Sequence, residues 1–147
     1  MAGMFSVAER STGAGSATLP VFSIFAASAV VFRVREIGVF NTTNTACAVA
    51  LRRYTAQGTP GTGLTEMPWD VDTAAATATA FNTHSITPTF VTGNIRYASL
   101  GAAVGAGVIW TFGQGGLEVN PGTGNGIGIS VPTGTGQILD FYIDWEE

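Results

Sequence analysis

Residues 30–55, VVFRVREIGVFNTTNTACAVALRRYT, decide the fold class, because they read as two long strands joined by a polar turn. Over residues 32–40 the side chains alternate with a period of two, which is the period of a strand. One predicted face carries Phe32, Val34, Gly38 and Phe40, and the other carries Arg33, Arg35, Ile37 and Val39. Residues 41–45, NTTNT, have short side chains that bond to their own backbone and indicate a turn. After it, Cys47, Val49 and Leu51 alternate with alanines, so we predict a β-hairpin.

The composition agrees with an all-β domain. Hydrophobic residues make up 46% of the 147-residue chain and charged residues only 11%, against about 25% in an average protein. The 20 glycines and the short apolar runs favour strands and turns over helices. Further runs with strand character are residues 21–25, 81–87, 94–100, 108–112, 117–119, 127–131 and 139–146. Eight or nine strands predict an antiparallel two-sheet jelly-roll-like sandwich.

The first 19 residues are predicted to form an extended N-terminal arm, with a single sandwich domain over residues 20–147. Residues 11–18, STGAGSAT, contain no side chain large enough to offset the entropy lost when the segment becomes ordered. We therefore expect a neighbouring chain to hold the arm in place.

Residues 57–80 form the longest irregular stretch, which suggests a functional or interfacial segment. Asp72 is a candidate cap for one or two helical turns, and Asp70 with Asp72 is a candidate weak calcium site. Trp69 either docks against a neighbouring protein or plugs one end of the core.

The charged residues point to protein partners. All six basic residues are arginine, the cation that interfaces retain, and there is no lysine. A net charge of −4 argues against binding to nucleic acid, and the apolar run at residues 19–32 is too short to span a membrane. We take Arg10, Arg52, Arg53 and Trp69 as the candidate partner-binding residues.

Motifs for catalysis, cofactors or metals are incomplete. His84 is the only histidine, so a zinc site lacks ligands and a Ser/His/Asp relay has one possible centre. The glycine clusters lack the lysine of a phosphate-binding loop and are predicted to be turns. Asp140, Asp144 and Glu146 share one strand face, where acids serve a glycosidase or bind calcium in some proteins but are more simply solvated or paired with arginine. Cys47 is expected to be a small buried hydrophobe. We expect no catalytic residues, cofactor or metal.

Five segments resemble small β-rich virion proteins of tailed bacteriophages. They are VREIGVFNTT (34–43), AVALRR (48–53), LGAAVGAG (100–107), GNGIGI (124–129) and DFYIDWEE (140–147). Small jelly-roll proteins of that group commonly sit on the capsid exterior as trimeric decoration or cement proteins. The resemblance therefore implies a homotrimer whose partner is the major capsid protein.

The leading hypothesis is a non-enzymatic capsid decoration protein that binds between major capsid subunits and stabilises the head. A tail, neck or head-fibre protein is the first alternative. A carbohydrate-binding sandwich that stacks Trp69, Trp110 or Tyr142 on sugars is the second, although the alternation around Trp110 predicts that this residue lies in the core.

Overall fold

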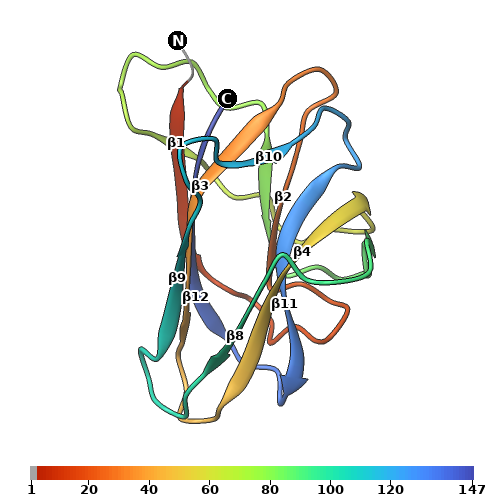
Figure 1. Cartoon of the computed structure of the whole chain (residues 1–147), viewed down its shortest axis with the longest axis vertical. Helices are drawn as coiled ribbons and strands as arrows, with labels where there is room; N and C mark the ends of the chain where they lie inside the picture. Colours follow the sequence, from red (N-terminus) through yellow and green to blue (C-terminus); the bar gives the residue numbers. More distant parts are fainter. Residues whose placement is uncertain (1–2) are drawn as a thin grey trace.

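A computed structural model describes residues 3–147 and shows two antiparallel β-sheets packed face to face (Figure 1). The described residues contain no helix, and therefore no helix that is long and apolar enough to cross a membrane. The strands are β1 Met4–Arg10, β2 Phe22–Phe25, β3 Phe32–Asn41, β4 Cys47–Ala56, β5 Met67–Pro68, β6 Thr79–Asn82, β7 Thr89–Phe90, β8 Arg96–Leu100, β9 Gly107–Thr111, β10 Leu117–Val119, β11 Gly126–Gly134 and β12 Leu139–Glu146. The predicted all-β sandwich is confirmed.

The strand order is that of a jelly roll. Sheet A runs β10-β3-β12-β1-β5, with β9 also paired to β3, and sheet B runs β6-β2-β11-β4-β7, with β8 also paired to β4. The chain crosses from one sheet to the other at eight places: β1–β2, β2–β3, β3–β4, β4–β5, β5–β6, β8–β9, β10–β11 and β11–β12. Eight of the twelve strands, β1-β12-β3-β9 in sheet A and β2-β11-β4-β8 in sheet B, make up the jelly-roll pattern.

The predicted hairpin at residues 30–55 is wrong, although both of its strands exist. β3 pairs with β12, β9 and β10 in sheet A, whereas β4 pairs with β11, β7 and β8 in sheet B. Residues 42–46 therefore form an arch between the sheets. Asn41 braces it by donating from Nδ2 to the carbonyls of Thr45 (2.7 Å) and Gly101 (3.1 Å). A strand, a polar turn and a second strand look alike in sequence whether the strands pair or face each other.

The predicted alternation along β3 is also wrong beyond Val34. Val34 is opposite Trp145 and Glu36 is opposite Asp144, so Arg35 is an extra residue in β3, which is a β-bulge. The bulge reverses which side chains face the core, because Phe32 and Val34 are buried before it, and Ile37 and Val39 after it. Glu36 and Gly38 thus lie on the outer face of sheet A.

The predicted N-terminal arm is wrong for the described part of residues 1–19; Met1 and Ala2 lie outside the described residues. β1 pairs with β12 along its whole length, and Phe5 and Val7 are buried in the core. Residues 11–18 are held within the chain as well: the backbone N–H groups of Thr12 and Gly13 donate to the side chains of Asn82 and Thr83. The small residues become ordered because backbone and side-chain hydrogen bonds tie them to the sandwich, so their order no longer requires a neighbouring chain.

The core lies between the two sheets. On β12 the predicted alternation is confirmed, with Leu139, Phe141, Ile143 and Trp145 buried. Phe22 of sheet B stacks on Phe141 of sheet A with ring centroids 4.6 Å apart, which joins the sheets directly. Cys47 and Trp110 are buried, as predicted. The proposed short helix after Asp72 is absent, since residues 71–78 form turns and irregular backbone.

Candidate functional site

The outer face of sheet A carries a row of polar and aromatic side chains from three strands and from the residue that follows a fourth. Ser6 of β1 is opposite Asp144 of β12, and Asp144 is in turn opposite Glu36 of β3. Trp69, which directly follows β5, joins this row because its Nε1 donates to Ser6 Oγ at 2.6 Å. Together with Tyr142, these residues form what we call the sheet-A strip: Trp69, Ser6, Asp144, Glu36 and Tyr142.

Hydrogen bonds orient the two carboxylates of the strip. Ser6 Oγ donates to Asp144 Oδ1, and the Tyr142 hydroxyl donates to Glu36 Oε1 at 2.6 Å. Tyr142 is held in turn by stacking on Phe40, with ring centroids 6.3 Å apart. Asp144 Oδ2 and Glu36 Oε2 accept no hydrogen bond from residues 3–147. The strip therefore presents two oriented acceptor oxygens to solvent.

Asp144 of β12 and Glu36 of β3 have no arginine partner within the described chain, unlike the other two acids of β12. Asp140 pairs with Arg10 at 2.7 Å and Glu146 pairs with Arg35 at 2.6 Å. Burial raises the pKa of Asp144, the hydrogen bond from Ser6 opposes this, and the nearby charge of Glu36 raises the pKa further. Burial and Glu36 raise the pKa of Tyr142 to about 12. Within residues 3–147, Asp144 and Glu36 are thus neighbouring negative charges that accept hydrogen bonds from hydroxyl groups and form no ion pair with an arginine.

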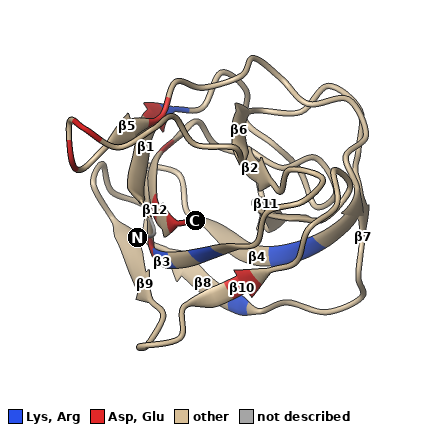
Figure 2. Ribbon diagram, turned by 90° about the horizontal axis from the view of Figure 1, so that it is seen from above, with Lys and Arg blue, Asp and Glu red and all other residues tan. Residues whose placement is uncertain are grey.

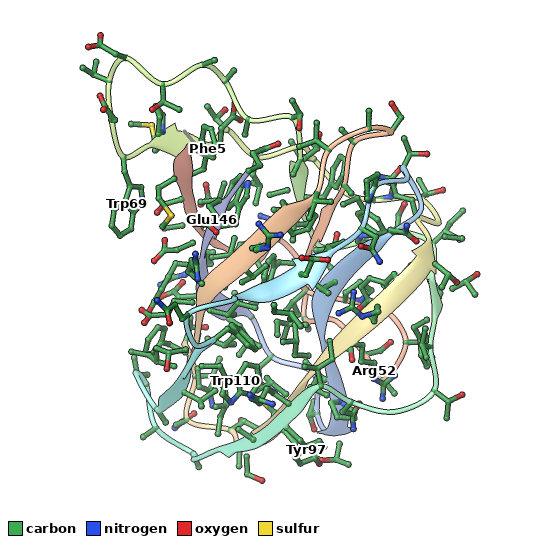
Figure 3. All side chains as sticks on the ribbon, turned by 45° about the horizontal axis from the view of Figure 1, so that its top comes forward. Phe5, Arg52, Trp69, Tyr97, Trp110 and Glu146 are labelled. Carbon is green, nitrogen blue, oxygen red and sulfur yellow. The ribbon has the colours of Figure 1, made fainter. Side chains whose placement is uncertain are left out.

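Trp69 lies on the surface, so its alternative placement as a core plug is wrong. Its side chain is 64% exposed, and Figure 3 shows it at the outer side of β5, projecting away from the core. The hydrogen bond from its indole nitrogen to Ser6 limits rotation of the ring. Met67 and Val71, which flank it, are 65% and 90% exposed. A large apolar ring is therefore held in position at one end of the sheet-A strip.

The three candidate arginines are engaged within the chain. Arg10 makes two parallel bonds to Asp140. On β4, Arg52 donates to Asn94 Oδ1 and to the Ala17 carbonyl, and it lies 4.7 Å from the ring centre of Phe90. Arg53 donates to the Glu118 carbonyl at 3.0 Å. The structure does not bring the four predicted residues together, since Arg10 and Trp69 belong to the sheet-A side and the other two to β4 of sheet B. Figure 3 shows Trp69 and Arg52 far apart on the sandwich.

A second surface feature is the uncharged edge of sheet A at β9. Phe112 N donates to the Arg35 carbonyl and Asn41 N donates to the Ala106 carbonyl. These two bonds show which residues between them are hydrogen-bonded to β3, because hydrogen-bonded and non-hydrogen-bonded pairs alternate along an antiparallel ladder. Val108 and Trp110 accordingly direct their backbone toward β3, while the backbone groups of Gly107, Ile109 and Thr111 point outward. Residues 97–117 contain no charged side chain. Figure 2 shows β9 at the border of the sandwich without coloured, charged segments.

His84, which follows β6, and Ser23 of β2 form a buried pair. Ser23 Oγ and His84 Nε2 are 2.6 Å apart, and both residues are almost completely buried. Burial lowers the pKa of His84, an effect that the backbone of Ile86 partly opposes. His84 Nδ1 has no carboxylate beside it to orient the ring, as a catalytic relay would need. The pair is closed to substrate and fastens residues 83–88 to β2.

The other candidate ligand sites do not assemble. Asp70 and Asp72 line a pocket of about 450 Å³ at the end of the sandwich, together with Phe5, Val30 and Glu147. No group of three or more metal-ligating side chains occurs within residues 3–147. The carboxylate of Glu147 is already occupied, since Oε1 accepts bonds from the Thr77 backbone and the Trp145 indole.

Ser6 and Glu36 are the two strip residues that sequence reasoning missed. Ser6 falls within the predicted arm, and the period-two alternation predicted for β3 does not reveal the bulge that determines the position of Glu36. Asp144 and Tyr142 were placed correctly on the outer face of β12, and Asp140 and Glu146 prove to be paired with arginine as expected.

Comparisons of the chain with models of known protein families, with curated proteins and with solved structures find no match.

Proposed function

We propose that this chain is a non-enzymatic structural protein of a bacteriophage virion. In this proposal it is a homotrimeric decoration, or cement, protein on the capsid exterior that binds between major capsid protein subunits. The resemblance of five sequence segments to small virion proteins supports the proposal, and the jelly-roll sandwich agrees with it. No cofactor, nucleic acid or membrane takes part.

The observation that carries the proposal is the unprotected edge at β9. Proteins normally protect edge strands with charged residues, proline or bulges, because open backbone groups pair with other chains. β10, which continues the same edge, has such protection in the ion pair between Arg33 and Glu118. β9 has open backbone groups at three residues, and Ile109 is 53% exposed. We therefore expect a neighbouring chain, in the trimer or on the capsid, to cover β9.

The positions of the candidate reactive groups favour a structural role over catalysis. The Ser23–His84 pair is sealed from solvent, and the free carboxylate oxygens of Asp144 and Glu36 lie on the face of a sheet rather than within the described pockets. An enzyme needs its reacting groups and substrate enclosed in a common, water-excluding cleft. Binding to the surface of another protein does not require such a cleft.

The test is cryo-electron microscopy of capsids incubated with the full chain, together with its mass by light scattering. Density between major capsid subunits and a trimer mass are expected. Ile109→Lys, which places a charge at the open edge, should abolish occupancy; Val71→Lys, which adds the same charge at another exposed site, should not. Density only on the tail, neck or head fibres would assign the protein there and overturn the decoration role. Equal occupancy by both variants would remove β9 from the interface.

A further inference from the structure

We propose that the sheet-A strip is a binding site for a neutral oligosaccharide. In this site one face of a pyranose ring packs on the indole of Trp69, and sugar hydroxyl groups donate hydrogen bonds to Asp144 and Glu36. Sugar binding is a function separate from capsid attachment, and it does not depend on where in a virion the protein sits.

Trp69 has the properties of a stacking platform. One face of a pyranose ring presents mainly C–H groups, which are favourably removed from water against an aromatic ring. The indole of Trp69 is 64% exposed and is tethered through Nε1 to Ser6. Because the ring is already restrained, little side-chain entropy is lost when a ligand packs on it. This distinguishes Trp69 from an exposed apolar residue without a fixed orientation.

The carboxylates supply the hydrogen-bond acceptors that sugar hydroxyls require. Charge-assisted O–H···O⁻ bonds are stronger than bonds between neutral groups. Asp144 Oδ2 and Glu36 Oε2 are unpartnered within the described chain, while their second oxygens are held by Ser6 and Tyr142. Side chains directly opposite each other on neighbouring strands are about 5 Å apart at Cβ, which is comparable to the width of one sugar ring. The acceptors are thus arranged before the ligand binds.

The charge of the strip selects among ligands. Two neighbouring carboxylates without an arginine repel uronic acids, sialic acids and sulfated sugars. A cationic side chain of a partner protein would also be attracted, but it needs only the two acids. The exposed indole, held in line with the acids, fits a longer ligand that covers the row from Trp69 to Glu36. Binding that is lost without the Trp69 ring therefore indicates a sugar, and binding that persists without it indicates a cationic side chain.

The experiment uses the full chain on a glycan array that includes bacterial surface polysaccharides, followed by NMR. In a ¹⁵N spectrum the indole N–H of Trp69 is identified by its loss in Trp69→Phe. Titration with the best neutral oligosaccharide from the array should shift this signal and leave those of the buried Trp110 and Trp145 in place. Trp69→Ala and the nearly isosteric Asp144→Asn should each weaken binding by roughly tenfold or more. Tyr97→Ala, which removes an exposed aromatic side chain from sheet B, is the matched control and should bind normally.

Several outcomes would overturn the proposal. One is an array on which no neutral glycan gives a signal above that of Trp69→Ala. Another is equal binding by wild type, Trp69→Ala and Asp144→Asn, with each variant shown to be folded by its thermal transition. A third is binding of N-acetyl-arginine amide that is suppressed by salt and persists in Trp69→Ala, with no shift of the Trp69 indole by any sugar, which would identify a cationic protein ligand instead.

Discussion

The ring of Tyr142 lies directly over Gly38 of the neighbouring strand β3. The two residues are paired across the strands, and a Cβ atom at position 38 would overlap the Tyr142 ring. Gly38 therefore provides the space in which Tyr142 lies flat on sheet A and reaches Glu36. The absence of a side chain at one position of β3 thus determines how an acid of the sheet-A strip is oriented.

Gly38→Ala should consequently displace Tyr142 and break its hydrogen bond to Glu36. Forcing an extra methyl group into a packed site costs about 1–3 kcal/mol, and we expect a loss of stability in that range by urea denaturation. Gly113→Ala is the control, because nothing lies within 4 Å of a Cβ at that position. Equal stability of the two variants would show that Tyr142 moves aside freely.

Phe5→Ala should destabilise the sandwich strongly, because Phe5 is buried and stacks on Trp145 with ring centroids 5.7 Å apart. We expect a loss of about 3–5 kcal/mol in the free energy of unfolding, and a change in the near-ultraviolet circular dichroism of Trp145. Glu9→Ala, an exposed position on the same strand, should change stability by less than about 0.5 kcal/mol. A deletion of residues 1–10 that left the unfolding transition unchanged would restore the view of this segment as a dispensable arm.

Stability should fall on mild acidification because of His84, the only histidine in the chain. Burial lowers the pKa of His84 in the folded protein, so the unfolded chain takes up the proton at a higher pH than the folded one. The stabilising contribution is complete above the ordinary value of 6.5 and declines as the pH falls toward the lowered pKa. Urea midpoints between about pH 7.5 and about pH 5.5 should decrease for wild type and much less for His84→Gln. Parallel curves would mean that His84 is not the group responsible.

Asp140 and Asp144 should titrate on opposite sides of the ordinary aspartate pKa of 3.8, although both project from the outer face of β12. The hydrogen bond from Arg10 lowers the pKa of Asp140, whereas burial raises that of Asp144. Carboxyl ¹³C titration measures both values directly. In Arg10→Gln the Asp140 midpoint should rise and the Asp144 midpoint should stay.

The two shifts have opposite consequences for stability. The contribution of Asp140 is present above its unfolded pKa and is lost as the pH falls through its lowered folded pKa. For Asp144 the folded state binds the proton first, so ionisation at neutral pH is unfavourable to folding. Asp144→Asn should therefore be more stable than wild type at neutral pH, by a margin that shrinks as the pH falls through the raised pKa. A margin independent of pH would contradict this assignment.

Local residue patterns determined which segments of this protein are strands. The period-two alternation of β12, the run Leu117–Val119 and the low charge were sufficient for an all-β sandwich, because burial of one strand face requires such a pattern. They also placed Trp110 in the core and Asp144 and Tyr142 on the outer face. These properties depend only on neighbours in the chain.

Only the tertiary structure decided which strands pair. β3 and β4 follow each other across a polar turn, yet β3 pairs with β12, 98 to 113 residues later, and β4 pairs with β11, 72 to 87 residues later. The bulge at Arg35 and the pairing of β1 with β12 are likewise set by hydrogen bonds between distant segments. The row of Trp69, Ser6, Asp144 and Glu36 joins β1, β12 and β3 with the residue that follows β5, so no local pattern could reveal it. Backbone N–H and C=O groups are the same in nearly every residue, so the sequence does not show which distant strand they pair with. For this reason the sheet-A strip is recognised only in the folded structure.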